Sequence, residues 1–439
     1  MSSQFQLLRE TRFRPFFLTQ FLGAFNDNVF KNALIVLLTF QAGQWTSLAP
    51  GVLANLAAGL FILPFFLFSA SAGQLADKYD KARLARLVKL LEIGIMLLAG
   101  AGFALHSLPL LLTALFLLGL HSTLFGPVKY AILPQHLRED ELIGGNALVE
   151  AGTFVAILLG TLAGGLLAAQ ADGTLWITGF SLLVAIAGYA SSRQIPTAPA
   201  PMPALRVNPN PFSETWRNIG FARKEKAVFL SILGISWFWL YGALFLAQFP
   251  AYARTVLGGD EGAVTLLLTV FTLGIGSGSL ACEKLSGHKV EVGLVPLGAV
   301  GLSLFGLDFA WASPAMASVQ GQPVAALLAA PGTWRLLADL LLLGVFGGFY
   351  CVPLYALMQQ RSDADFRARI IASNNILNAL FMVGGALAAA ALLGSGAGIP
   401  TLFAWAALAN ALVAIYIFSV VPEFPRRCLA WLRREGGSR

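Results

Sequence analysis

Long apolar stretches alternate with short polar segments along the chain. A helix rises 1.5 Å per residue, so about 20 residues cross the roughly 30 Å of hydrocarbon in a bilayer. Barrel strands would be about ten residues long with alternating polarity, and these stretches are longer and more uniformly apolar. The pattern predicts an all-α integral membrane protein with twelve transmembrane helices, at residues 16–40, 52–76, 84–105, 108–128, 143–169, 174–192, 227–250, 263–281, 292–312, 334–358, 370–394 and 399–421.

The composition supports this class of protein. The chain is 57% hydrophobic and 12% charged, with a mean hydropathy of +0.73, whereas a soluble domain is about 25% charged. The first apolar stretch has full span length and no small-residue cleavage pattern, so we expect it to remain as the first span. Three cysteines without paired spacing predict no disulfide and no metal site, and no cofactor is predicted: Cys282, Cys351 and Cys428.

The positive charge follows the predicted topology. The net charge is +7, and all but four of the 29 Lys and Arg residues fall on one side of the spans. Arg254 and Arg335 lie on the other side, and Lys31 and Lys129 lie in or at the edge of spans. By the positive-inside rule, both termini are expected in the cytoplasm. The basic excess is therefore a topology signal that also favours anionic headgroups, and no nucleic-acid partner is predicted.

A proline-rich segment divides the chain. Residues 193–212 read RQIPTAPAPMPALRVNPNPF, in which the prolines block helix formation and favour an extended linker. Short echoes between the halves, such as GQLADK at 73–78 and GSLACEK at 278–284, indicate two pseudo-symmetric repeats. The predicted parts are an N-terminal six-helix bundle at 1–192, a cytoplasmic linker at 193–225, a C-terminal six-helix bundle at 226–421 and a basic cytoplasmic tail at 422–439.

The loop GQLADKYDKAR at 73–83 resembles the signature of the major facilitator superfamily. Asp80 stands where the second glycine of that signature is usual. The resemblance implies that Asp77 lies against the positive N-terminal end of span eleven, at 366–370, as a latch that closes the cytoplasmic side and breaks when the halves rock. An ordinary charged turn is the alternative. The residues that match the signature are Gly73, Asp77, Lys78, Lys81 and Arg83.

Four stretches resemble the lysophospholipid transporter (LplT) family. The resemblance implies an acidic cavity residue at Asp27 and a basic one at Lys129. The family's basic residue in span seven has no counterpart at 236–250, a segment without charge, which leaves as substitutes Trp237, Trp239, Tyr241 and Gln248. The stretches that carry the resemblance are QFLGAFNDNVFKN at 20–32, GQLADKYDK at 73–81, FGPVKYAILPQ at 125–135 and NALVEAGTFVAILLG at 146–160.

Polar residues form a stripe on the first span. Gln20, Asp27 and Lys31 are 7 and 4 residues apart, which places them within about 40° of one another on a helix. Charge that faces lipid is very costly, so we expect the stripe to face the bundle interior or a hydrated, substrate-binding cavity. The alternative is that Asp27 and Lys31 only neutralise each other as a structural pair.

Five further positions are candidates for substrate binding. Lys129 either extends to lipid headgroups or binds a phosphate as a point charge. Asn146 and Glu150 are stacked at i,i+4 in span five, and Asn374 and Asn378 occupy the echoed positions in span eleven. Glu150 is expected either to pair with one of the two span lysines or to carry a proton.

Other residues in the spans have structural interpretations. Gly160 and Gly164, four residues apart, predict close helix packing. Arg335 and Asp339 at i,i+4 are expected to pair locally. Two acidic residues in or near spans have no partner identifiable from the sequence: Glu92 and Asp308.

No catalytic motif accompanies these residues, and the chain is predicted not to be an enzyme. His136 is followed five residues later by Glu141, which resembles the H-x-x-x-x-D pair of acyltransferases but falls in a solvated loop. A G-x-S-x-G elbow and a phosphate-binding loop ending in Gly-Lys-Ser or Gly-Lys-Thr are absent from the sequence. The resemblance to the LplT family implies the function: transport of lysophospholipids, such as lysophosphatidylethanolamine or lysophosphatidylglycerol, across a bacterial inner membrane by alternating access, for reacylation.

Two alternatives remain open at this point. One is a proton-coupled exporter of amphipathic small molecules or drugs on the same fold. The other is a non-transporting membrane partner of an acyltransferase. The chain ends at RRCLAWLRREGGSR without a fused enzyme domain, so an acyltransferase or acyl-ACP synthetase partner is expected to be a separate protein, and the transporter itself to be a monomer.

Overall fold

The structure is a computed structural model that describes residues 4–313 and 319–436, except 42, 44, 47 and 49. Among these residues, twelve helices are long and apolar enough to cross a membrane. They are α1 (Arg14–Phe40), α2 (Pro50–Lys78), α3 (Lys81–Ala104), α4 (Leu108–Ala131), α6 (Leu142–Ala168), α7 (Gly173–Ser192), α9 (Lys226–Thr255), α10 (Glu261–Leu285), α11 (Leu294–Ala312), α13 (Thr333–Arg361), α14 (Arg367–Gly394) and α15 (Ile399–Val420).

These helices confirm the predicted all-α class, and each predicted span overlaps one of them. No β-strand is formed by the described residues; an isolated bridge joins Gly259 and Gln322. Shorter elements complete the chain: η1 (Gln4–Arg9), α5 (Leu133–His136), η3 (Glu139–Glu141), α8 (Pro211–Arg223), α12 (Val324–Ala329) and α16 (Glu423–Gly436).

The two segments predicted to be linker and tail both contain a helix. In the linker, α8 begins at Pro211, and the side chain of Asn210 caps it by accepting hydrogen bonds from the amides of Phe212 and Ser213. In the tail, Arg427 of α16 pairs with Glu291 at 2.7 Å. Residues 437–439 of the predicted tail lie outside the described residues.

The helices form two compact units. Neither unit coincides with a predicted bundle, because α6 and α14 are each divided between the units. Each unit therefore combines segments from both halves of the sequence. Unit 1 contains Met1–Arg138, Val155–Lys224 and Ser362–Ala379, and unit 2 contains Glu139–Phe154, Glu225–Arg361 and Leu380–Arg439.

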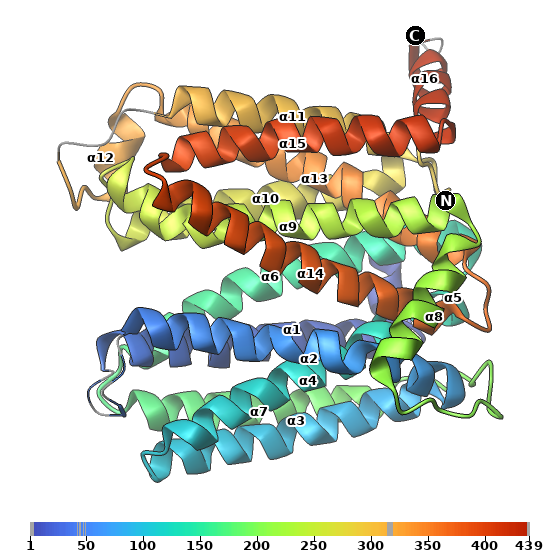
Figure 1. The fold of residues 1–439 in the computed structure, drawn as a ribbon, viewed down its shortest axis with the longest axis horizontal. Coiled ribbons are helices and arrows are strands. Elements are labelled where there is room, and N and C mark those ends of the chain that lie inside the picture. Colours follow the sequence, from blue (N-terminus) through green and yellow to red (C-terminus); the bar gives the residue numbers. More distant parts are fainter. Residues whose placement is uncertain are drawn as a thin grey trace. The chain divides into compact units, whose positions relative to one another are not determined.

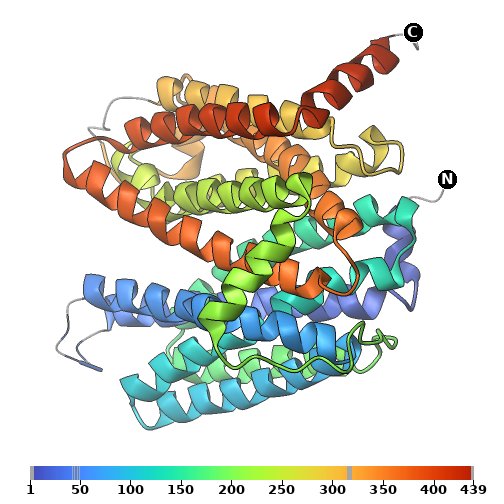
Figure 2. The ribbon, with the colours of Figure 1, turned by 45° about the vertical axis from the view of Figure 1, so that its right-hand side comes forward.

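Unit 1 is organised around α3 and α4. Helix α3 packs against α4 and α7, α2 packs against α4 and α8, and α1 packs against α2 and α7 (Figure 1, Figure 2). An apolar cluster fills part of the space between these helices, and its fully buried members include Leu34, Leu37, Ile95, Leu115 and Leu118. The polar residues described below lie on the same helices.

Unit 2 is rich in aromatic contacts. Helix α13 packs against α9, α10 and α11, and α15 packs against α9 and α11 (Figure 1). Phe245 of α9 stacks on Phe403 of α15 with ring centroids 4.1 Å apart, and Phe309 of α11 lies 5.7 Å from Phe403. Such ring pairs stabilise packing beyond their buried area.

Glycines allow α6 to approach α1 closely within unit 1. A Cβ atom on Gly160 would lie 2.5 Å from the carbonyl oxygen of Phe25, and a Cβ on Gly164 would lie 2.5 Å from that of Val29. These separations are too short for any side chain, so the close packing predicted for the two glycines is confirmed.

Replacing Gly164 by Ala is expected to destabilise the protein, because the new methyl group collides with the backbone of α1. Overpacking of this kind typically costs about 1–3 kcal/mol. Gly165→Ala is the matched control, since nothing lies within 4 Å of a Cβ at that neighbouring position. Thermal unfolding in detergent should show a lower midpoint for Gly164→Ala alone; equal midpoints would contradict the tight contact.

Candidate functional site

A buried ion pair on α3 holds part of the polar surface of α1. Lys89 and Glu92 are one turn apart, with Nζ 2.7 Å from Oε2, and their side chains are 0% and 1% exposed. Asn26 of α1 donates to Oε1 of Glu92 at 2.7 Å. Gly23 of α1 leaves room for the ammonium, because a Cβ there would occupy the position of Lys89 Nζ. Glu92, which lacks an identifiable partner in the sequence, therefore has two hydrogen-bond donors in the structure.

Asp27 lies at the accessible edge of the same cluster. Its side chain is 12% exposed, and its Oδ2 accepts a hydrogen bond from the hydroxyl of Ser122 on α4. His121 lies between the two carboxylates, with Nδ1 3.8 Å from Asp27 Oδ1 and Nε2 3.3 Å from Glu92 Oε2. We call Asp27, Lys89, Glu92 and His121 the charge cluster. It joins three helices of unit 1, with Asp27 from α1, Lys89 and Glu92 from α3, and His121 from α4.

Lys31 has different neighbours from Asp27. Its ammonium donates to Oδ1 of Asn28 at 3.0 Å and lies 5.2 Å from the centre of the Phe61 ring. The i,i+4 ion pair considered for Asp27 and Lys31 is therefore not formed. Gln20, the third residue of the predicted stripe, is 2% exposed within unit 1.

Asp77 lies against the start of α14, as the superfamily resemblance implies. Arg369 Nε donates to Asp77 Oδ2 at 2.9 Å, and the backbone amide of Ala368 donates to Oδ1 at 3.2 Å. Both side chains of the ion pair are at most 2% exposed. Gly73 permits this approach, since its Cβ would lie 2.7 Å from that of Ala372. A carboxylate at a helix N-terminus is also favoured by the helix dipole.

The proline-rich linker covers this ion pair. The amide of Met202 donates to the carbonyl oxygen of Asp77 at 2.9 Å, and Arg369 Nη2 lies 3.1 Å from the sulfur of Met202. Phe221 of α8 and Phe366 stack with centroids 4.3 Å apart, and the Arg369 guanidinium lies 5.0 and 4.8 Å from them. The linker and α8 thus pack directly on the pair.

The remaining residues of the signature loop connect it to the linker. Asp80 has φ −56°, so no glycine is needed there, and its side chain caps α3 through the amide of Arg83 at 2.8 Å. The other oxygen of Asp80 accepts from the amide of Ala198 at 2.8 Å. Lys81 is 2% exposed and its amide donates to Ala198, whereas Lys78 lies 5.6 Å from the ring centre of the adjacent tyrosine.

In unit 2, the candidate Asn146 forms a reciprocal amide pair with Gln359. Asn146 Nδ2 donates to Gln359 Oε1 at 2.7 Å, and Gln359 Nε2 donates to Asn146 Oδ1 at 2.9 Å. Both residues are 0% exposed, and Glu150 on the next turn of α6 is 1% exposed. Full mutual satisfaction makes this pair a packing contact between α6 and α13.

Trp237 and Tyr241 of α9 are also engaged in packing. The indole N–H of Trp237 donates to Asn410 at 2.8 Å, and the hydroxyl of Tyr241 donates to the carbonyl oxygen of Leu302 at 3.0 Å. The indole N–H is the single hydrogen-bond donor of a tryptophan side chain, so Trp237 has no donor left for a ligand. Trp239 donates to Tyr355 at 2.9 Å and stacks on an α6 phenylalanine.

The last candidates lie in unit 1. Asn374 is 0% exposed, and neither polar atom of its side chain has a hydrogen-bond partner among the described residues. Asn378, one turn further along α14, and Lys129 of α4 are partly buried. Asn374 is therefore a second place in unit 1 where polar groups are available to a bound molecule or water.

The predicted Arg335 and Asp339 pair needs correction. Arg335 Nε donates to Asp308 Oδ2 at 3.2 Å, and Nη2 binds the other oxygen of Asp308, so the ion pair joins α13 to α11. The bidentate geometry across helices explains the preference for Asp308, which the sequence left without a partner.

An apolar groove lies elsewhere in unit 1, between α2, α3 and α4. It has a volume of about 210 Å³. Because its lining is aliphatic, it offers no group that could hold a headgroup. The residues that line it are Ala72, Leu75, Leu84, Leu87, Val88, Leu91 and Leu124. No group of three or more metal-ligating side chains occurs in the described part of the chain.

Comparison with protein families decides the identity of the chain. The family model described as "Major Facilitator Superfamily" matches residues 16–325, more than half of the chain. A "Lysophospholipid transporter LplT" of Escherichia fergusonii is 30% identical over 88% of this chain and 92% of its own length. A protein of the same name from Klebsiella pneumoniae is 31% identical over 78% of each chain. This chain belongs to the LplT family of the major facilitator superfamily.

Solved structures share the fold of this LplT-family member. The human organic anion transporter MFSD10 superposes with a TM-score of 0.71 at 16% identity, covering 92% of this chain and 99% of its own. The Escherichia coli fucose:proton symporter FucP superposes with a TM-score of 0.64 at 14% identity, covering 94% and 99%. The family and the twelve apolar helices identify a multi-pass protein of the bacterial inner membrane.

The sequence prediction for this family member missed two residues of its charge cluster. The charge count places Lys89 on the cytoplasmic side, whereas it is buried in α3. His121 was not selected, although it is an ionisable residue inside a predicted span. Both residues could have been selected from the sequence, because ionisable residues inside apolar stretches are rare and usually functional.

Removing the Lys89 charge is expected to destabilise this transporter-family fold. Lys89→Met leaves Glu92 buried without its ion-pair partner, which costs about 3–5 kcal/mol, whereas the double variant Lys89→Met/Glu92→Gln should recover most of the loss. Lys31→Met is the control, because the Lys31 ammonium binds an amide oxygen. Unfolding in SDS titrations measures the effect. Equal stability of the single and double variants would refute the compensation.

Asp77→Asn is expected to loosen the start of α14, because it removes the charge that binds Arg369 and the amide of Ala368. Hydrogen exchange of peptides from 362–379 should become at least about tenfold faster, the equivalent of 1.4 kcal/mol. Asp80→Asn is the control, since the hydrogen bonds of the Asp80 side chain go to the amides of Arg83 in α3 and Ala198 in the linker. Unchanged exchange in Asp77→Asn would contradict a holding role for the carboxylate.

Proposed function

We propose that this protein moves lysophospholipids across the bacterial inner membrane by alternating access, for reacylation on the cytoplasmic side. The names of its relatives, at 27–31% identity over at least 78% of the chain, support the substrate class. The single structural observation that carries the proposal is the Asp27 carboxylate, which lies within α1, a helix long and apolar enough to cross a membrane, and at the accessible edge of the charge cluster. Ionised groups are kept in membrane spans chiefly where they handle a polar substrate.

The headgroup chemistry fits the polar residues of α1. The ammonium of lysophosphatidylethanolamine is a complement for Asp27, and Lys31 and Lys129 are candidate partners for the phosphate, which lysine binds as a point charge. Gln20 and Asn374 are further candidate donors in unit 1. Glu150 and Asn378 stay secondary candidates, and Asn146, Trp237 and Tyr241 become the weakest, because their donors are used in packing.

Conformational change is assigned to the signature loop. The Asp77 and Arg369 pair would be the latch that breaks during transport, with Gly73, Lys78, Lys81 and Arg83 shaping the loop around it. Its complete burial under the linker supports this role, since a covered ion pair gives a discrete closed state.

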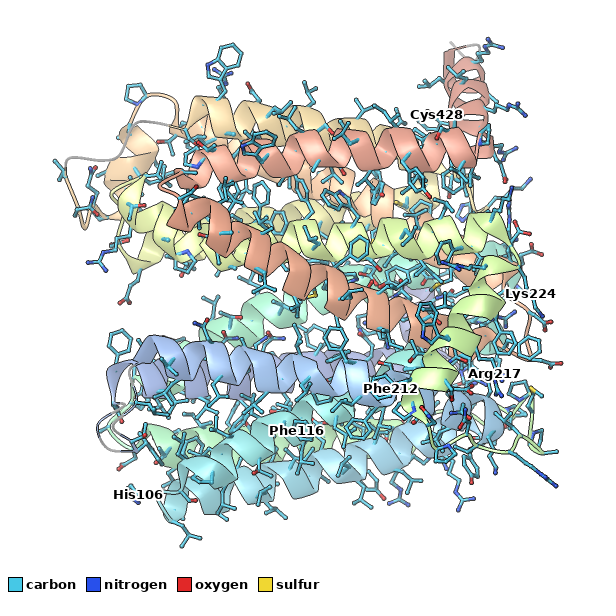
Figure 3. The ribbon with its side chains drawn as sticks, viewed as in Figure 1. His106, Phe116, Phe212, Arg217, Lys224 and Cys428 are labelled. Atoms are coloured by element: carbon cyan, nitrogen blue, oxygen red, sulfur yellow. The ribbon has the colours of Figure 1, made fainter. Side chains whose placement is uncertain are left out.

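The topology proposed from the charge distribution places both termini and the linker in the cytoplasm. Helix α8 is suited to the headgroup region, because Phe212 and Trp216 are 72% and 71% exposed and the same short segment carries the basic residues Arg217 and, directly after the helix, Lys224. Figure 3 shows Phe212, Arg217 and Lys224 along this segment. We infer a monomer that delivers lysolipid to a separate acyltransferase or acyl-ACP synthetase. Cysteine labelling at the termini of intact and permeabilised cells tests the orientation; labelling of intact cells would reverse it.

Asp27→Asn is expected to reduce uptake of labelled lysophosphatidylethanolamine into proteoliposomes by about 10- to 100-fold, because a charge-assisted hydrogen bond contributes about 1.5–3 kcal/mol. Asp172→Asn is the control, since Asp172 is exposed in the loop before α7. Albumin extraction of the outer leaflet measures uptake. Unchanged uptake in Asp27→Asn would remove the proposed role, and gradient-driven transport of drugs with no lysolipid movement would favour a proton-coupled exporter instead.

A further inference from the structure

The charge cluster contains two carboxylates, Asp27 and Glu92, and one lysine, Lys89. One negative charge is therefore left to be compensated. Lys89 compensates Glu92 through the 2.7 Å ion pair, while Asp27 accepts a hydrogen bond from the Ser122 hydroxyl and, within the part of the chain that the structure describes, forms no ion pair with a lysine or arginine; Lys31, one turn along α1, binds Asn28 instead. An uncompensated carboxylate in a low-dielectric interior is unfavourable, and it draws in either a proton or a cationic ligand. The missing positive charge therefore has to come from an exchangeable source.

His121 is placed to hold that charge. It is 2% exposed and lies 3.8 Å from Asp27 and 3.3 Å from Glu92. Neither ring nitrogen makes an aligned hydrogen bond within the described residues. The charged groups that face it are Asp27 from α1 and Lys89 and Glu92 from α3; α7 presents Gly188 to this region. A doubly protonated imidazole would donate to one carboxylate on each side.

We propose that Asp27, His121 and Glu92 form a proton-binding site, with the proton held on His121 while Asp27 has no cationic partner. When the amine of a headgroup binds Asp27, it supplies the missing positive charge, and the proton leaves His121 for bulk water along the accessible Asp27 side. No covalent step is involved: one N–H bond of the imidazolium breaks and one hydronium forms. The exchange of cation for proton rests on the proposed function, whereas the protonation of the empty site does not.

Amine binding and proton release are thereby linked. If one proton leaves for each amine bound, the affinity for lysophosphatidylethanolamine rises by up to about tenfold per pH unit wherever the empty site is protonated. Lysophosphatidylglycerol has no amine and would not replace the proton, so its binding should lack this pH dependence. The site would therefore discriminate headgroups by charge and couple their binding to pH.

Proton release on ligand binding tests the linkage. Purified wild-type protein in weakly buffered detergent with a pH dye should release about one proton for each lysophosphatidylethanolamine bound, and His121→Gln should release none for each lysophosphatidylethanolamine that it binds. His106→Asn is the control: His106 lies in the loop after α3 (Figure 3) with φ 50°, a conformation that Asn adopts readily. Lysophosphatidylglycerol should release no proton from wild-type protein. Binding of lysophosphatidylethanolamine without proton release would overturn the exchange and leave the proposed transport function standing.

A second measurement does not depend on lysolipid, and its deciding arm uses the wild-type protein alone. The chain has only four histidines, so ¹⁵N-labelled imidazole signals can be assigned individually. In wild-type protein without ligand at about pH 6.5, both ring nitrogens of His121 should carry protons, and in Asp27→Asn only one. A singly protonated His121 in the empty wild-type protein would overturn the proton site. Absence of any lysolipid binding, with His121 doubly protonated, would instead reject the proposed substrate and keep the proton site.

Discussion

The Lys89 and Glu92 ion pair is the interaction on which the polar interior of unit 1 depends. Charge is expensive in a helix bundle surrounded by hydrocarbon, and it becomes tolerable when each group finds an opposite charge and hydrogen-bond donors. Glu92 has Lys89 and Asn26, and it also attracts His121. Because Glu92 contacts α1 through Asn26 and α4 through His121, the ion pair lies where three helices meet, with Asp27 at its edge.

The same physical rule shapes the signature loop. Asp77 is buried with Arg369, and the linker, α8 and an aromatic pair cover the guanidinium. Here the partners lie almost 300 residues apart in the sequence, so the pair can hold two elements together only while they are folded next to each other. The Lys89 and Glu92 pair lies within one helix and can persist when helices move. The Asp77 and Arg369 pair joins two helices, so it is suited to break and re-form when those helices separate.

Buried polar groups have different partners in the two units. Unit 1 contains paired charges, whereas the Asn146 and Gln359 contact of unit 2 is neutral and self-satisfied. A neutral amide pair has no charge to compensate and does not respond to a proton or to a charged headgroup. Among the described residues, the buried amide pair of unit 2 therefore needs no compensating charge, whereas the buried ion pairs of unit 1 each need a partner of opposite sign.

The sequence by itself determined the twelve helices. A stretch of about twenty apolar residues in a membrane can satisfy its backbone N–H and C=O groups within the segment only as a helix. The sequence also marked Asp27 and Asp77, since charge in an apolar stretch and a family signature are both local. Only the tertiary structure decided the partners: Glu92 and His121 for the region of Asp27, Arg369 for Asp77, and Asp308 rather than Asp339 for Arg335. It also showed that the linker covers the Asp77 and Arg369 ion pair and that α6 and α14 are divided between units. Hydropathy and helical spacing fix which face of a helix is polar, but the distance between charges on different helices depends on how those helices pack.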